Sequence, residues 1–356
     1  MTRRTVPLSV IMPVYNAGVF LRPALESIRN QTYSDFECLL CDASTDGSSD
    51  FLADFCRLDE RFILLRQEKT TLGHVLAQGV EAARADLVAR MDADDIALPH
   101  RFAVQVARMK REPGLVLLGS AFQYIDANGS LGRISTLPRW SAFPEELLWG
   151  CPFSHPSVIF RREAALQAGN YRPFFAGAED YDLWLRMSAF GKVDNLPDIL
   201  LRYRMHGRNS VSRYAHAGRR FAVVAQMLHC IDAGREGNVP RTEPTDDIAM
   251  LGKMLDPAER LRVLARMLSS SAHLTGDAED DPEGAAWLEE IQAAPADAAL
   301  KKALALYHVR CVKRYIRKQP YRASRHFVKA CRYNPGIVMS TLGKLAMQQF
   351  RRLRQP

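Results

Sequence analysis

Short apolar runs alternate with stretches of helical periodicity through the first ninety residues of the chain. The apolar runs have the length of buried strands and are Leu8–Met12, Phe36–Cys41, Phe62–Leu65 and Asp86–Ala89. Between them, the spacing of apolar side chains predicts helices near 21–28, over 48–58 and around 73–84. This alternation predicts an α/β fold with a mostly parallel sheet and helices on both faces.

Polar clusters follow three of the predicted strands. They are Pro13–Asn16, Asp42–Ser48 and Asp92–Asp95. Ligands of such sheets bind beyond the carboxyl ends of the strands, so we expect the three clusters to share one crevice. Neither a Gly-x-Gly-x-x-Gly motif after the first strand nor a Gly-Lys-Ser/Thr loop occurs, which argues against dinucleotide dehydrogenases and P-loop NTPases.

The segment Arg90-Met91-Asp92-Ala93-Asp94-Asp95 concentrates negative charge at a strand end. Unpaired carboxylates repel one another and lose hydration there, so packing alone gives no reason for them. Mg²⁺ and Mn²⁺ take carboxylate oxygens and complete their shell with phosphates and water. The segment therefore indicates a metal that carries a diphosphate. The alternative is a solvated acidic turn in which Asp95 caps a helix beginning at Ile96.

The second half offers further candidates, each with a plain structural alternative. Glu179 and Asp180 begin a helix with periodic apolar residues. The alternative to a role in the site is that they are first-turn acids, which the helix dipole stabilises. His155 lies between Ser154 and Pro156 and is either a ligand contact or a buried histidine with satisfied hydrogen bonds. Trp149 and Trp184 could stack on a ligand, but core packing is favoured at apolar helical positions.

Charge is unevenly distributed toward the end of the chain. Residues 271–300 hold eight Asp/Glu and no Lys/Arg, whereas residues 301–356 hold fifteen Lys/Arg and no Asp/Glu. The segment 274–284 is expected to be an acidic connector. Helical spacing continues through 301–356, and 337–354 is amphipathic and basic. This tail could pack on the acidic segment, form the core of a helical subdomain, or bind an anionic membrane surface.

Composition is that of an ordinary globular protein, with 47% hydrophobic and 25% charged residues among 356. No run of 18 apolar residues occurs, so we expect no membrane-spanning helix. The seven cysteines are scattered without Cys-x-x-Cys spacing, which favours a reducing compartment over disulfides or zinc. With no signal-peptide core after the basic N-terminus, a cytoplasmic location is expected.

A series of motifs, in this order and spacing, resembles family 2 of the inverting glycosyltransferases. The motifs are Ser9–Asn16, Cys41–Ser48, Ala89–Asp95, Pro99–Phe102, Gly119–Ser120, Pro152–Val158, Ala178–Arg186 and Tyr203–His206. The resemblance covers roughly residues 8–212 and implies a GT-A fold. It predicts a glycosyltransferase domain over 1–212, with a nucleotide-sugar half at 1–98 and an acceptor half at 99–212. Residues 213–356 would form a mainly helical extension.

The resemblance also implies roles for the nucleotide side of the site. Pro13, Tyr15 and Asn16 would frame the base, and Asp42 would accept a hydrogen bond from uracil N3–H. Asp92 would contact the ribose and diphosphate, and Arg90 is either structural or a diphosphate contact. Asp94 would bind Mn²⁺ or Mg²⁺ directly, and His206 would close over the metal or the diphosphate; a plain loop histidine is the alternative.

On the acceptor side, the resemblance implies that Asp180 is the general base and that Glu179 binds or orients the acceptor. His155 and Trp184 are the weaker acceptor candidates. The sequence departs from the family pattern in two places. Cys41 replaces the first of two usual aspartates, and the segment 70–79 lacks the customary Asn or Arg.

The sequence thus predicts metal-assisted, inverting transfer of a sugar from a UDP-sugar to a hydroxyl of a glycan or lipid-linked acceptor. The alternatives are a non-catalytic nucleotide-sugar-binding protein and a sugar nucleotidyltransferase. The expected partners are the donor, the acceptor and an anionic membrane surface at the inner face of the membrane, reached through the basic tail. No nucleic-acid partner is expected.

Overall fold

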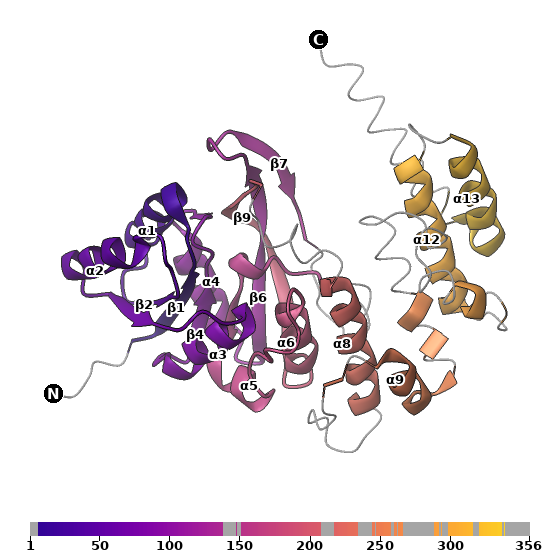
Figure 1. Ribbon diagram of the computed structural model, residues 1–356, viewed down its shortest axis with the longest axis horizontal. Helices are drawn as coiled ribbons and strands as arrows, with labels where there is room; N and C mark the ends of the chain where they lie inside the picture. The colour runs from indigo at the N-terminus through magenta and orange to yellow at the C-terminus, as the bar shows by residue number, and fades with distance from the viewer. Residues whose placement is uncertain are drawn as a thin grey trace, which may run out of the picture. The chain divides into compact units, whose positions relative to one another are not determined.

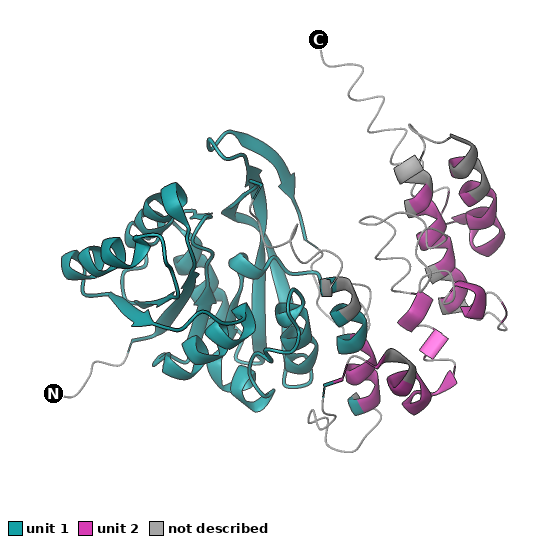
Figure 2. Cartoon of the chain, in the orientation of Figure 1, with its two compact units in different colours: residues 1–147, 151–225, 232–244 teal, residues 148–150, 226–231, 245–356 magenta. Residues whose placement is uncertain are grey.

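The structure is a computed structural model, drawn in Figure 1. It describes residues 6–137, 147, 151–207, 217–233, 244–245, 247–257, 260–261, 263–265, 288–291, 293, 298–315, 320–336 and 338. The chain divides into two compact units, coloured separately in Figure 2. Unit 1 comprises 1–147, 151–225 and 232–244, and unit 2 comprises 148–150, 226–231 and 245–356. The predicted boundary at residue 212 lies outside the described residues.

The first half of unit 1 has the predicted strand–helix alternation. Its strands are β1 (Leu8–Val14), β2 (Glu37–Asp42), β3 (Phe62–Arg66) and β4 (Leu87–Arg90), and its helices are α1 (Leu21–Arg29), α2 (Ser48–Leu58) and α3 (Leu72–Ala82). The strands lie in the order β3-β2-β1-β4, and all three pairings are parallel. The expectation of a parallel sheet therefore holds for this half.

Side-chain alternation along the strands assigns the helices to the two faces of the sheet. Val10, Met12 and Leu40 share one hydrophobic cluster with apolar residues of α1, α2 and α4 (Arg101–Arg111). Ile11 and Cys41 point the opposite way, toward α3. Gly79 of α3 lies so close to them that an added Cβ would meet Ile11 Cγ2 at 2.7 Å. Helices thus cover both faces, as predicted.

The second half of unit 1 makes the sheet mixed. The short strand β8 (Ile159–Arg161) runs antiparallel between β4 and β6 (Leu115–Ile125). The long strand β9 (Lys192–Arg204) is parallel to β6. Two further strands complete the sheet, and both are antiparallel to their partners: β5 (Ile96–Ala97) on β9 and β7 (Leu131–Ser135) on β6. Helices α5 (Arg162–Gln167) and α6 (Glu179–Met187) belong to this half.

The placement of β5 corrects one alternative for the acidic segment. Ile96 and Ala97 pair with Arg202 and Leu201 of β9, so no helix begins after Asp95. Asp95 is instead buried and accepts a hydrogen bond from the backbone N–H of Arg204, 2.7 Å from Oδ1. The acidic turn is therefore held by strand pairing, and Asp95 is not a helix cap.

The remaining helices are α8 (Ala217–Ala233), α9 (Ile248–Met254), α12 (Ala298–Tyr315) and α13 (Pro320–Tyr333). The predicted helical periodicity is found in α12 and α13, which pack together around Val309 and Ala330. The acidic connector at 274–284 and, apart from Val338, the amphipathic segment 337–354 lie outside the described residues. In the parts of the chain that the structure describes, no helix combines the length and apolar character that a membrane span needs.

Candidate active site

The carboxyl ends of β1, β2 and β4 lie side by side and bring the three polar clusters together. Val14 pairs with Asp42 across β1 and β2, and Ile11 pairs with Arg90 across β1 and β4. The loops that follow these strands therefore start from one edge of the sheet. The convergence expected from the sequence is present in the structure.

The first two loops are tied to each other through Asn16. Its backbone is left-handed, with φ of 51°, and its N–H donates to Ser44 Oγ at 3.1 Å. Asn16 Oδ1 accepts from the N–H of Thr45 at 2.8 Å. An asparagine tolerates this conformation better than most residues, and its amide can bridge two backbones. The neighbouring Tyr15 is 44% exposed, and Lys69 Nζ lies 5.1 Å from its ring centroid.

Asp42 and Cys41 point to opposite faces of β2. Asp42 is buried and accepts hydrogen bonds from the N–H of Ser44 at 3.0 Å and from Ser49 Oγ at 2.5 Å, which fix its carboxylate at the strand end. Cys41 is buried beneath α3, and burial raises the pKa of its thiol to about 12. Cys41, which stands where the family usually has an aspartate, therefore lies in the core under α3. This is the face of β2 opposite to the one that carries the Asp42 side chain.

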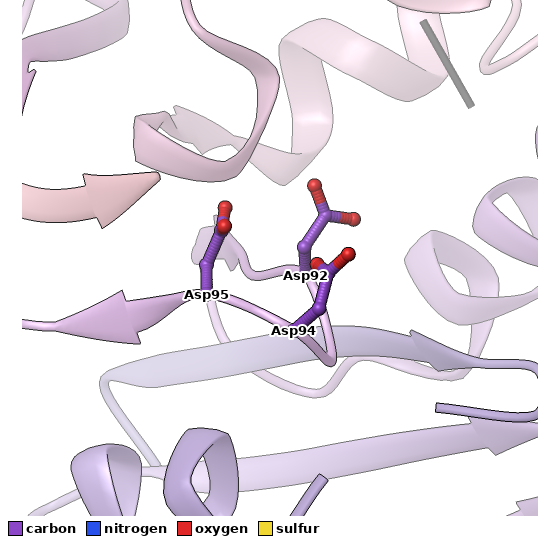
Figure 3. Close-up of side chains that lie close together, drawn as sticks. All are labelled: Asp92, Asp94 and Asp95. Carbon is purple, nitrogen blue, oxygen red and sulfur yellow. The ribbon is translucent and has the colours of Figure 1, made fainter. Parts of the chain in front are cut away.

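The acidic loop after β4 gathers three carboxylates. Oxygen atoms of Asp92, Asp94 and Asp95 all lie within 4.8 Å of one another. Figure 3 shows the three side chains projecting from the same side of the loop. The side chains of Asp92 and Asp94 are 27% and 25% exposed, whereas Asp95 is buried. Asp92 and Asp94 are therefore the two that a ligand from solution can reach.

Electrostatics in this loop favour a bound cation. Burial, and then the charge of Asp92, raise the pKa of Asp94, and burial together with both neighbours raises that of Asp95 well above its usual range. This effect is partly offset by Arg90 and by His206, whose Nε2 lies 2.8 Å from Asp94 Oδ2. Closely spaced carboxylate oxygens of this kind could hold Mg²⁺ or Mn²⁺.

His206 is held against the loop by an aromatic contact. Its ring stacks on Phe20 of the short helix η1 (Gly18–Phe20), with centroids 4.8 Å apart. The guanidinium carbon of Arg204 lies 5.0 Å from the centroid of the Phe20 ring. Arg204 Nε also donates to the carbonyl oxygen of Asp94 at 2.8 Å. The structure thus brings together Asp94 and His206, the two residues expected at the metal.

Arg90 connects the acidic loop to the acceptor side. Its guanidinium is buried, and Nη1 lies 2.5 Å from Asp92 Oδ2. The positive charge also lowers the pKa values of Asp94, Glu179 and Asp180 against the larger effect of burial. Arg90 therefore pairs with one acid and influences the acids on both sides of the site.

Glu179 and Asp180 form the first turn of α6. Asp180 Oδ1 accepts from the N–H of Tyr181 at 2.7 Å, and Glu179 Oε2 accepts from the N–H of Gly177 at 2.6 Å. Burial, and then the neighbouring Asp180, raise the pKa of Glu179 to about 7. Burial also raises the pKa of Asp180, and the charge of Asp92 adds to that shift. Asp180 of α6 and Asp92 of the acidic loop are therefore close enough for the charge of one to affect the other.

The two weaker acceptor candidates lie next to each other. His155 begins the short helix η3 (His155–Ser157), and its Nδ1 lies 3.8 Å from Asp180 Oδ2. Trp184 is 0% exposed and packs against Phe153, His155, Phe160 and Tyr171. Its indole has no face open to a sugar, so the core-packing alternative is the one the structure supports.

Arg101, for which no role was predicted, supports the backbone on both sides of the site. Although charged, it is fully buried, and Nη2 donates to the carbonyl of Arg90 at 2.7 Å and to that of Val158 at 3.3 Å. Its Nε donates to Gln105 Oε1, and Gln105 Nε2 donates to the carbonyl of Ser157 at 2.8 Å. One side-chain pair thus joins the acidic loop to the His155 turn. The Pro99–Phe102 motif contains Arg101 and is the feature of the sequence that could have indicated this role.

A parallel strand edge with an acidic loop on one side and the acid pair Glu179 and Asp180 on the other agrees with the comparison to known families. Residues 9–169 match the family model described as glycosyl transferase family 2. The chain is 31% identical over 211 residues to the O-antigen biosynthesis glycosyltransferase WbnJ of Escherichia coli, covering 57% of this chain and 81% of that protein. The chain belongs to family 2 of the glycosyltransferases and is a glycosyltransferase.

A second relative and two solved structures agree with this assignment. The amylovoran biosynthesis glycosyltransferase AmsE of Erwinia amylovora is 35% identical over 202 residues, which cover 55% of this chain and 75% of that protein. Among structures, S. aureus TarS 1-349 in complex with UDP-GlcNAc has a TM-score of 0.57 at 17% identity, covering 91% of each chain. The mannosyltransferase PcManGT from Pyrobaculum calidifontis, in complex with GDP-Man and Mn²⁺, has a TM-score of 0.51 at 17% identity, covering 94% of this chain and 88% of that chain. These likenesses confirm the GT-A fold.

Proposed function

We propose that this glycosyltransferase moves a sugar from a UDP-sugar to a hydroxyl of a glycan or lipid-linked acceptor, with inversion and with the help of Mn²⁺ or Mg²⁺. The observation that carries the proposal is the electrostatic link between the acidic loop and α6. Asp180 lies close enough to Asp92 and Arg90 for both charges to act on its pKa. Donor and acceptor chemistry can therefore meet in one place.

On the donor side, Asp42 would accept from uracil N3–H beside the exposed ring of Tyr15. The hydrogen bonds from Ser44 and Ser49 hold the carboxylate in place before the base arrives. Pro13, near the end of β1, and Asn16, in the loop after it, would frame the base, because Asn16 fixes the loop that carries Tyr15. A UDP-GlcNAc complex of TarS, which shares the fold, supports a uridine donor.

Asp94, Asp92 and His206 would hold the metal and the diphosphate between them. A divalent cation bound there would neutralise the charge that develops on the leaving diphosphate. Asp92 keeps its orientation through Arg90, and His206 keeps its orientation through Phe20 and Asp94. Arg90 is best placed to organise Asp92, because its guanidinium is buried behind that carboxylate.

On the acceptor side, Asp180 would take the proton from the attacking hydroxyl. A carboxylate whose pKa is raised by burial is a stronger base than one in water. First-turn acids that serve only the helix dipole are normally stabilised in their ionised form. The raised pKa values of Asp180 and Glu179 therefore favour the catalytic interpretation. Glu179 would orient the acceptor or receive the proton next.

The two alternatives differ in what the site would contain. Family membership argues against a sugar nucleotidyltransferase. A non-catalytic nucleotide-sugar-binding protein would not need both the acidic loop and the acid pair on α6. The relatives named for O-antigen and amylovoran biosynthesis support a polysaccharide or lipid-linked acceptor.

The test combines donor hydrolysis with ligand binding. UDP-sugars should be hydrolysed in Mn²⁺ and not in EDTA, and UDP should bind more tightly than GDP or CDP by calorimetry. Asp180→Asn should keep UDP affinity and lose roughly 10²–10⁴-fold in turnover. Asp198→Asn, an exposed change on β9, is the matched control and should behave as wild type. Full turnover by the Asp180 variant, or a preference for GDP, would refute the respective assignment.

We also propose that the basic tail places the enzyme on an anionic membrane surface. Each basic residue near such a surface contributes on the order of 1 kcal/mol of attraction. The full chain should co-sediment with anionic vesicles and be released by salt. Truncation after Asn334 should weaken sedimentation and leave donor hydrolysis intact. Equal recovery of both proteins in the supernatant at low salt would reject the membrane role.

A further inference from the structure

A tyrosine and a histidine adjoin the proposed base without a role in the reaction described so far. We infer that Tyr171 and His155 are positioning residues for Asp180: the Tyr171 hydroxyl holds a neutral His155 in the tautomer whose proton is on Nδ1, and this N–H is directed at Asp180 Oδ2. The inference rests on the proposed function, because it takes Asp180 to be the base.

The three side chains form a short chain of polar atoms. Tyr171 Oη lies 3.0 Å from His155 Nε2, and His155 Nδ1 lies 3.8 Å from Asp180 Oδ2. Trp184 meets the imidazole nearly at a right angle, with ring centroids 5.9 Å apart and an interplanar angle of 82°. The rings of Trp184 and Tyr171 therefore both contact the imidazole, and its Nδ1 lies near the carboxylate.

Hydrogen-bond requirements select the tautomer. Burial raises the pKa of Tyr171 well above its usual range and lowers that of His155, so the phenol keeps its proton and the imidazole is neutral. Within the described part of the chain, His155 Nε2 is the one hydrogen-bond partner of Tyr171 Oη. A buried hydroxyl proton needs an acceptor. Nε2 must then accept, which leaves the imidazole proton on Nδ1.

The backbone that carries Tyr171 is firmly anchored, as a positioning role requires. Asn170 is left-handed, with φ of 57°, and its Nδ2 donates to the carbonyl of Ala77 at 3.0 Å. Its own carbonyl accepts from Arg186 Nη2 at 2.8 Å. The residue that precedes Tyr171 is thus tied to two different helices, α3 and α6.

The Nδ1–H completes the environment of Asp180. Oδ1 already accepts from the N–H of Tyr181, so Oδ2 is the oxygen left for the acceptor hydroxyl and for His155. The charge of Arg90 favours the ionised form of Asp180, and the charge of Asp92 opposes that form. The other titratable groups that face it are Glu179, Tyr171 and Cys151. The separation of 3.8 Å must shorten by roughly 0.6 Å to become a hydrogen bond, and catalytic contacts commonly tighten when substrate binds.

The first test is Tyr171→Phe, made in wild type and in Asp180→Asn. Without the hydroxyl, the imidazole proton is free to move to Nε2, and a lone pair then faces Asp180. In wild type, kcat should fall about tenfold, as for the loss of a hydrogen bond to a charged group. The acid limb of the kcat/KM profile should move upward by about one pH unit. In the Asp180→Asn background the same change should have no further effect.

The second test compares His155→Asn with His155→Gln. The asparagine amide can place an N–H where Nδ1 stands, whereas the glutamine amide reaches toward Nε2. The asparagine variant should keep most of the wild-type acid limb, and the glutamine variant should resemble Tyr171→Phe. Nitrogen-15 NMR of the wild-type imidazole gives a readout independent of activity and should find the proton on Nδ1.

Two kinds of failure are distinguishable. If Asp180→Asn keeps full turnover, the base assignment in the proposed function is wrong. If Asp180→Asn is impaired but Tyr171→Phe costs the same in both backgrounds, the base stands and the positioning role is refuted. A resident proton on Nε2 would also overturn the inference, whatever the kinetics.

Discussion

Replacing Asp94 by asparagine should stabilise the metal-free protein and remove its stabilisation by Mn²⁺. In the folded chain, Asp94 faces Asp92 and Asp95, with oxygen atoms of all three within 4.8 Å of one another. Asparagine has nearly the same shape and can still accept from His206. The change therefore removes a repelling charge without opening a cavity, and it removes a carboxylate that a cation would need.

The size of the effect follows from the geometry. Two carboxylates separated by 4.8 Å repel by roughly 3 kcal/mol at an effective dielectric constant of about 20. Side-chain exposure of 27% for Asp92 and 25% for Asp94 reduces this, and the attraction of His206 is lost as well. A net gain of about 1 kcal/mol remains, or about 2–4 °C in Tm. Saturation with Mn²⁺ at about 100 times its Kd would stabilise wild type by about 2.7 kcal/mol and reverse the order.

The advantage of the asparagine variant depends on pH. Because burial and Asp92 raise the pKa of Asp94 above its ordinary value of 3.8, ionisation of this group costs folding stability. That cost is absent at low pH, where Asp94 is protonated in both folded and unfolded chains. It grows as the pH rises through the folded pKa. The advantage of the variant should therefore increase from acid to neutral pH and then stay constant.

The assay is thermal unfolding of wild type and variant in EDTA and in a Mn²⁺ titration, with Asp198→Asn as a control that should follow wild type in both. A variant less stable than wild type in EDTA would show that the pairing of Asp94 with His206 outweighs the repulsion. Equal stabilisation of both proteins by Mn²⁺ would show that the metal binds elsewhere, and the reasoning about the acidic loop would fail.

Three further changes probe other parts of the site and its supports. Glu179→Gln should remove an inflection near pH 7 from the kcat/KM profile, because the pKa of Glu179 is raised to about 7; an unchanged inflection would assign it to another group. Gly79→Ala should destabilise the chain by about 1–3 kcal/mol, because the new methyl group meets Ile11 Cγ2 at 2.7 Å. Gly114→Ala, with open space around its Cβ, is its matched control in chemical denaturation. Trp184→Phe should cost roughly 1–3 kcal/mol through lost packing and leave the acceptor KM unchanged; a raised KM would return the indole to the acceptor site.

The sequence predicted the elements whose periodicity is long enough to be read locally. Leu8–Met12 and Phe36–Cys41 alternate between two buried faces, and both became parallel strands. The shorter strands could not be found in this way. Ile96–Ala97 has two residues and Ile159–Arg161 has three, so their pairing is fixed by distant partners and not by pattern.

The same limit applies to the site. The resemblance of Ala89–Asp95 and Tyr203–His206 to family motifs predicted that His206 lies close to the acidic loop. In the structure, His206 Nε2 lies against Asp94. Tyr171 has no local signal, since its role depends on the fold bringing it to His155 across 16 residues of chain. Arg101 has the charge of a surface residue, yet it is buried, and it donates there to the carbonyls of Arg90 and Val158.

The brace formed by Arg101 and Gln105 has a consequence for recombining this enzyme with its relatives. Its hydrogen bonds reach back to the carbonyl of residue 90 and forward to those of residues 157 and 158, so the pair fits only where these backbone segments keep the same relative positions. A crossover between residues 105 and 154 would combine a brace from one enzyme with a turn from another. Chimeras intended to exchange acceptor preference should therefore transfer residues 90–105 and 154–161 as a single inherited block.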